Sequence, residues 1–101
     1  MNLFDNPGGE MLVKAMLKLE TEEECRAFLE DLMTGREIAD CGQRLWVAKL
    51  LDQQLVYSRI AEITGASSAT ISRVNRSCTY GPGGYAVVLE RLKEEEANGN
   101  G

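Results

Sequence analysis

Side chains that can form hydrogen bonds or carry positive charge gather between Tyr57 and Arg76. Serine and threonine hydroxyls, asparagine amides and arginine guanidinium groups bond to phosphate oxygens and to base edges, and small methyl-bearing side chains can meet a thymine methyl group. The residues expected to face outward or to contact a duplex are Tyr57, Ser58, Arg59, Ser67, Ser68, Ala69, Thr70, Ser72, Arg73, Asn75 and Arg76. These groups suit the major groove of double-stranded DNA.

The charge distribution favours the same segment. Residues 57–80 contain three arginines and one glutamate, whereas the rest of the chain has 8 basic and 15 acidic residues. The segment is therefore locally positive within a chain of net charge -5. An acidic remainder disfavours indiscriminate binding to phosphate backbones, so a basic patch of this size predicts selective contact.

Other kinds of chemistry have little support in the composition. The 101 residues include no histidine, which removes the commonest general base and the commonest metal ligand. We therefore expect no enzyme, no catalytic residue, no metal and no cofactor. The cysteines Cys25, Cys41 and Cys78 are odd in number and form no CxxC pair, so we expect reduced thiols.

The ends and the apolar runs bear on where the protein resides. No apolar run approaches the roughly 18 residues that a membrane helix needs, and the first residues lack the basic start and apolar run of a secretory signal. The sequence thus predicts no membrane insertion and a cytoplasmic location.

The elements that position the candidate site have helical periodicity. A first helix is expected from about Gly9 to Leu19. Thr21 with Glu24, and Thr34 with Glu37, form two capping boxes, in which a side chain at each helix start bonds the backbone three residues away. Two consecutive helices with almost no loop between them follow, the second running to Leu51 or Asp52.

The segment after these helices has the layout of a helix-turn-helix. A short helix ends at Gly65, which can supply the positive φ of a helix C-terminus, and a second helix opens at Ser67 or Ala66. Ile71 and Val74 are expected to face inward from the second helix, together with Ile60, Ala61 and Ile63 from the first.

The remaining chain completes one helical domain spanning residues 1–101. The last helix is expected from about Pro82 to Ala97, because proline suits a first helical turn. Residues 1–8 and 97–101 are expected to be flexible ends. The first and last helices each show an apolar stripe that a short chain cannot easily cover by itself, which favours a homodimer.

The residues of the helix-turn-helix also carry a family resemblance. The stretch GASSATISR from Gly65 to Arg73, preceded by Gln43-Arg44-Leu45 and by VAKLL at 47–51, resembles the tryptophan-repressor superfamily, and more closely its YerC/YecD branch. The likeness runs from about Met11 to Leu92. It implies an all-α, six-helix protomer that intertwines with a second copy, and a sequence-specific transcriptional regulator, most simply a repressor.

The resemblance also implies a place for an effector. In tryptophan-binding members the corepressor lies between the long helix and the recognition helix, held by one arginine from each. Arg73 matches one of these arginines, whereas Gln43 stands at the other position and Val74 replaces a small glycine. Both departures argue against a tryptophan corepressor. The candidate effector pocket comprises Gln43, Arg44, Arg73 and Ser77, with the effector unknown.

Two functions remain open at the level of sequence. A dimeric regulator would place two recognition helices about 34 Å apart and bind a palindromic operator. The alternative is a protein-interaction module that keeps the fold without binding DNA, which the net charge of -5 and the few basic residues would suit.

Overall fold

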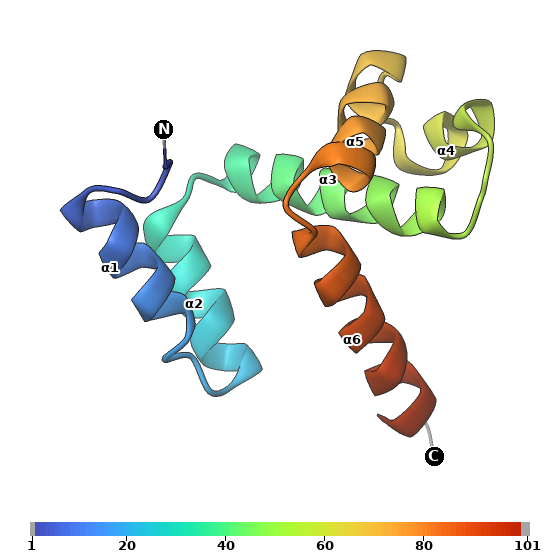
Figure 1. Ribbon diagram of the computed structural model, residues 1–101. Coiled ribbons are helices and arrows are strands. Elements are labelled where there is room, and N and C mark those ends of the chain that lie inside the picture. Colours follow the sequence, from blue (N-terminus) through green and yellow to red (C-terminus); the bar gives the residue numbers. More distant parts are fainter. Residues whose placement is uncertain (1, 100–101) are drawn as a thin grey trace. The chain divides into compact units, whose positions relative to one another are not determined.

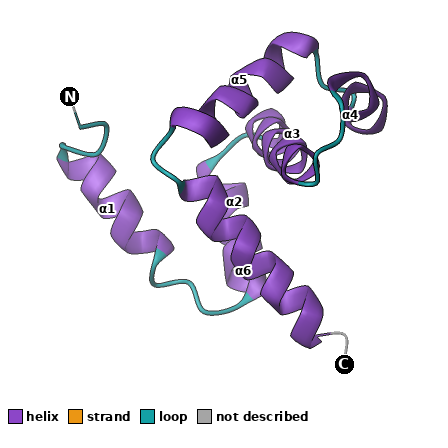
Figure 2. Cartoon of the chain, turned by 45° about the vertical axis from the view of Figure 1, so that its right-hand side comes forward, coloured by secondary structure: helices purple, strands orange, loops and turns teal. Residues whose placement is uncertain are grey.

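The computed structural model describes residues 2–99, which form six α-helices and no strand (Figures 1 and 2). The all-α, six-helix protomer expected from the sequence is confirmed. The chain divides into two compact units, with the boundary between Ile38 and Ala39. No helix within residues 2–99 is long and apolar enough to cross a membrane.

The first unit begins with α1 (Pro7–Met16). Asn6 caps this helix, because its side-chain oxygen accepts a hydrogen bond from the Gly9 N–H at 2.7 Å, and Pro7 fits the first helical turn. The predicted bounds of Gly9 to Leu19 were therefore wrong at both ends. Residues 7 and 8, expected in a flexible end, lie in the helix, while position 1 falls outside the described residues.

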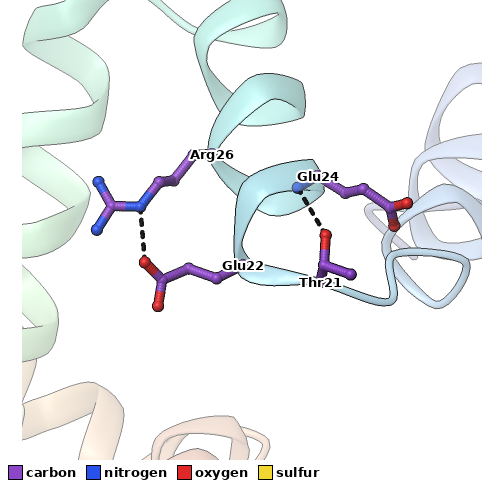
Figure 3. Close-up of polar contacts among 4 residues, drawn as sticks. All are labelled: Thr21, Glu22, Glu24 and Arg26. Carbon is purple, nitrogen blue, oxygen red and sulfur yellow. Dashed lines mark hydrogen bonds and ion pairs between the residues drawn. The ribbon is translucent and has the colours of Figure 1, made fainter.

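Helix α2 (Glu22–Leu32) begins at the predicted N-cap Thr21 (Figure 3), but the Glu24 carboxylate bonds the N–H one residue before the position that a capping box specifies. The Thr21 hydroxyl oxygen accepts from the Glu24 N–H at 3.0 Å, and the Glu24 carboxylate accepts from the Glu20 N–H at 2.9 Å. The Glu22 carboxylate forms an ion pair with the Arg26 guanidinium, one helical turn further along α2, at 2.9 Å. These local contacts fix the start of α2 without any help from distant residues.

Helix α3 (Gly35–Asp52) follows after a break of two residues. Thr34 and Glu37 make both bonds of the predicted capping box, at 2.9 Å from the Thr34 N–H to the Glu37 carboxylate and 3.1 Å from the Glu37 N–H to the Thr34 hydroxyl. The hydrogen bond from the Thr34 backbone is the main cause that holds the pKa of Glu37 below its usual range.

The second unit is built around the C-terminal half of α3. Helices α4 (Tyr57–Thr64), α5 (Ser68–Tyr80) and α6 (Gly84–Gly99) supply the rest of it, and both views show α4 and α5 beside α3 (Figures 1 and 2). The buried core consists of Val47, Ala48, Leu50, Ile60, Ala66, Ile71, Val74 and Leu89. Of the predicted inward positions, Ile60, Ile71 and Val74 are among them, whereas Ala61 and Ile63 are half-buried and pack against the core. The core thus sets which faces of α4 and α5 stay outside.

Helix α6 differs from the prediction at both ends. Gly83 has φ +90°, outside the helical region, so the helix begins at Gly84 and Pro82 lies before it rather than in its first turn. The helix continues to Gly99, two residues past the predicted end, and positions 100–101 lie outside the described residues. Ion pairs from Lys93 to Asp52 at 2.7 Å and from Lys49 to Glu96 at 3.4 Å link α6 to α3.

Candidate nucleic-acid interface

The paired helices α4 and α5 are joined by a tight turn and pack against each other. Gly65 adopts φ +74°, and its N–H donates to the Ala61 carbonyl at 2.9 Å, which ends α4 as the sequence predicts. Ser67 is the N-cap of α5, since its hydroxyl oxygen accepts from the Thr70 N–H at 3.1 Å. The turn is therefore defined by hydrogen bonds at both of its ends.

The exposed face of α5 follows from its buried face. Ile71 and Val74 are buried, and a helix advances 100° per residue, so the opposite side is left to solvent. Exposed residues at spacings of one, three and four positions share that side, which we call the outer stripe: Ser68, Ala69, Ser72, Arg73 and Arg76. Thr70 is half-buried, and the Ser67 side chain is occupied as the cap.

Asn75 lies on a different side of α5 from the outer stripe. It stands four residues after the buried Ile71, so the two point in similar directions. Although exposed, Asn75 lines a small hollow with Asp52, Cys78 and Tyr85. The structure thus places Asn75 toward α3 and α6, apart from the arginines with which the sequence had grouped it.

The candidate residues of α4 are exposed, yet one of them is already paired. Tyr57, Ser58 and Arg59 all lie on the surface at the start of the helix. The Arg59 guanidinium forms an ion pair with the Glu62 carboxylate at 2.9 Å, which offsets its charge. No described residue forms an ion pair with Arg73 or Arg76, so these two arginines carry the positive charge of the interface.

The structure gives the residues of the predicted effector pocket different neighbours. Gln43 donates its amide to the Thr64 carbonyl at 3.2 Å, and Arg44 donates to the Cys41 sulfur at 3.3 Å. Ser77 lines a mostly apolar hollow of ≈ 510 Å³ with residues of α3, α6 and the turn before α6, and its lining includes none of the other three. Within residues 2–99, no group of His, Cys, Asp and Glu side chains could hold a metal ion.

The contact between Gln43 and Thr64 was not predicted from the sequence. It joins residues 21 positions apart, and neither helical periodicity nor a capping motif signals a bond over that separation. The glutamine was visible in the sequence as a departure from an arginine. The structure shows that its amide binds the Thr64 carbonyl oxygen.

These observations define a class of protein. It is an all-α chain in which two packed helices, α4 and α5, expose a basic stripe. The sequence model of the family described as Trp repressor protein matches residues 9–93, and the chain belongs to that family. It is 45% identical over 87 residues to "Uncharacterized protein YerC" of Bacillus subtilis (strain 168), covering 86% of this chain and 84% of that protein.

Solved structures give the same relationship. A TrpR-like protein from Eubacterium eligens ATCC 27750 superposes with a TM-score of 0.87 at 47% identity, over 92% of this chain and 96% of that one. A candidate Trp repressor from Staphylococcus aureus gives a TM-score of 0.83 at 43% identity, over 87% and 88%. These relatives confirm both the TrpR-like fold and the YerC branch expected from the sequence.

Proposed function

We propose that this protein is a sequence-specific DNA-binding transcriptional regulator, in which α4 and α5 form the helix-turn-helix and α5 enters the major groove. The observation that carries the proposal is the outer stripe, where two arginines that form no ion pair with a carboxylate of residues 2–99 stand among small and hydroxyl side chains. Membership of a family described as Trp repressor protein supports repression as its effect. We expect it to act in the cytoplasm, and we expect no catalytic activity.

The dimensions of α5 suit this role. Its 13 residues span about 20 Å, and a helix fits a major groove about 12 Å wide. Arg73 and Arg76 can each donate two hydrogen bonds to a guanine edge, and the Ala69 methyl can meet a thymine methyl. Tyr57 and Ser58, at the start of α4, are placed for phosphate contacts that set the register of α5.

The regulator is proposed to act as a homodimer, intertwined as the family resemblance implies. Each unit leaves large apolar side chains exposed, including Met11 and Met16 of α1 with its C-cap residue Leu17, Trp46 of α3, and Val87, Val88 and Leu92 of α6. Covering these side chains with a second copy would remove apolar area from water. Two-fold symmetry then implies a palindromic operator with half-sites about 34 Å apart, the general spacing for dimeric helix-turn-helix proteins, Trp repressor included.

Selection of bound duplexes from a random-sequence pool, at near-physiological salt, tests the proposal directly. We expect enrichment of a palindrome whose half-sites lie one helical turn apart. Repeating the binding with added tryptophan tests the effector, and we expect no change, because the Gln43 amide is bonded to the Thr64 carbonyl and the branched Val74 is buried in the core.

The alternative is a protein-interaction module with the same fold. The exposed apolar side chains on α1 and α6 and the net charge of -5 favour it over a general nucleic-acid binder. Titration with duplex DNA at several salt concentrations separates the two functions. Absence of binding even at low salt would reject the regulator and favour the module, since phosphate contacts strengthen as salt falls.

A further inference from the structure

One side chain of α3 holds the turn between α4 and α5. The Gln43 Nε2 donates to the Thr64 carbonyl oxygen at 3.2 Å, and both residues are half-buried. Thr64 is the last residue of α4, so its carbonyl is among those that a helix leaves without an intrahelical partner. Gln43 therefore supplies, from another element, the donor that this helix end requires.

Hydrogen bonds within the turn also order it, and they are made by the Thr64 side chain. The Thr64 hydroxyl donates to the Ile60 carbonyl at 2.8 Å and accepts from the Ala66 N–H at 3.1 Å, and Ala66 itself is buried. Only three residues separate the end of α4 at Thr64 from the start of α5 at Ser68. With so short a connection, whatever fixes Thr64 relative to α3 also constrains the direction in which α5 leaves.

We infer that Gln43 is a positioning residue, which fixes the outer stripe relative to α3 and thereby aligns Arg73 and Arg76 with the groove. The inference rests on the proposed function, because reading DNA is what the alignment serves. A carbonyl oxygen only accepts, so the amide nitrogen of Gln43 is the atom that must face it. Base contacts depend on alignment more than phosphate contacts do, so Gln43 is expected to affect specificity.

Two near-isosteric substitutions remove the donor without removing bulk. Gln43→Met keeps the length of the side chain, and Gln43→Glu keeps its shape but cannot donate when ionised. Using the palindrome recovered by selection, we expect each variant to bind it about two- to tenfold more weakly, the worth of one hydrogen bond. For Gln43→Met, affinity for an unrelated duplex and the salt dependence of binding should be unchanged, because this substitution alters no charge.

Gln53 offers matched controls in the turn directly after the same helix. It is exposed near the C-terminal end of α3, and its side chain makes no hydrogen bond to a described residue. Gln53→Met and Gln53→Glu make the same chemical changes and the same change in charge. They should leave the ratio of specific to non-specific affinity as it is in the parent protein.

A second readout needs no DNA. Hydrogen exchange at the Gly65 and Ala66 amides should be faster in both Gln43 variants, since the turn loses its link to α3. An unchanged affinity ratio with unchanged exchange would overturn the inference. So would a parallel loss of specific and non-specific binding with a lowered thermal midpoint, which marks general destabilisation. If selection recovers no duplex, the proposed function fails, and exchange at these amides alone decides whether Gln43 holds the turn.

Discussion

At the scale of single residues, Arg73 and Arg76 are the groups on which DNA reading is predicted to depend. Arg73→Ala and Arg76→Ala should each weaken specific binding by about 1 to 3 kcal/mol where the arginine contacts a base. Measured affinities for the selected palindrome and its single-base variants would show at which position specificity is relaxed. Arg91→Ala, on the exposed surface of α6, removes the same charge elsewhere and is the control. Unchanged affinity in both α5 variants would contradict the assignment of the outer stripe.

Glu62 is predicted to restrain binding through its ion pair with Arg59. Glu62→Gln releases the guanidinium and removes a negative charge from the basic segment. Duplex affinity should therefore increase, and the slope of log affinity against log salt should steepen by up to about one, as for one added phosphate contact. Glu94→Gln on α6 makes the same charge change and should have little effect. Equal affinities for the Glu62 variant and the parent would show that Arg59 does not reach the backbone.

At the scale of elements, the turn between α4 and α5 depends on the backbone of Gly65. A Cβ at this position would meet no atom within 4 Å, so Gly65→Ala is penalised by its φ of +74° alone. The free energy of unfolding should fall by about 1 to 2 kcal/mol, measured by urea denaturation. Gly42→Ala also meets no atom, but lies within α3, and should instead stabilise by about 0.4 to 1 kcal/mol. Similar shifts in both variants would contradict this account.

The start of α3 is predicted to depend on pH through Glu37. Its pKa is lowered in the folded protein, chiefly by the hydrogen bond from the Thr34 backbone, so its ionised form stabilises the fold above the unfolded value of about 4.3. That contribution is lost as the pH falls through the lower, folded value. The stability difference between the parent and Glu37→Gln should therefore shrink on acidification. A difference that stays constant down to the lowest accessible pH would contradict the prediction.

The elements differ in how far the sequence could predict them. The starts of α2 and α3 and the end of α4 follow from bonds between residues three or four apart, and these were confirmed. The predicted start of α6 was wrong, because the positive φ of Gly83 outweighs the preference of Pro82 for a first helical turn. The sequence named all five residues of the outer stripe but grouped Asn75 with them, which lies on another side of α5. The Arg59–Glu62 pair and the Gln43–Thr64 bond depend on side-chain placement that helical spacing alone does not specify.

At the scale of the whole molecule, the outer stripe is a local basic surface on an acidic chain. With 16 acidic against 11 basic residues, the chain as a whole repels phosphate, so binding has to come from groups placed locally. A homodimer would double the basic stripe on one side of the assembly, and so make dimerisation a condition of tight binding. Loss of the dimer should then weaken DNA binding without any change in α5.

That coupling can be tested at Met11, which lies within α1 and is 68% exposed in the single chain. If a second copy covers it, Met11→Glu buries an unpaired carboxylate, and sedimentation should shift from about twice the 11.1 kDa chain mass toward one. Affinity for the full palindrome should fall, while helical content measured by circular dichroism is retained. Leu3→Glu, at an 82% exposed position before α1, is the control. A Met11→Glu protein that remains a dimer would place α1 outside the interface.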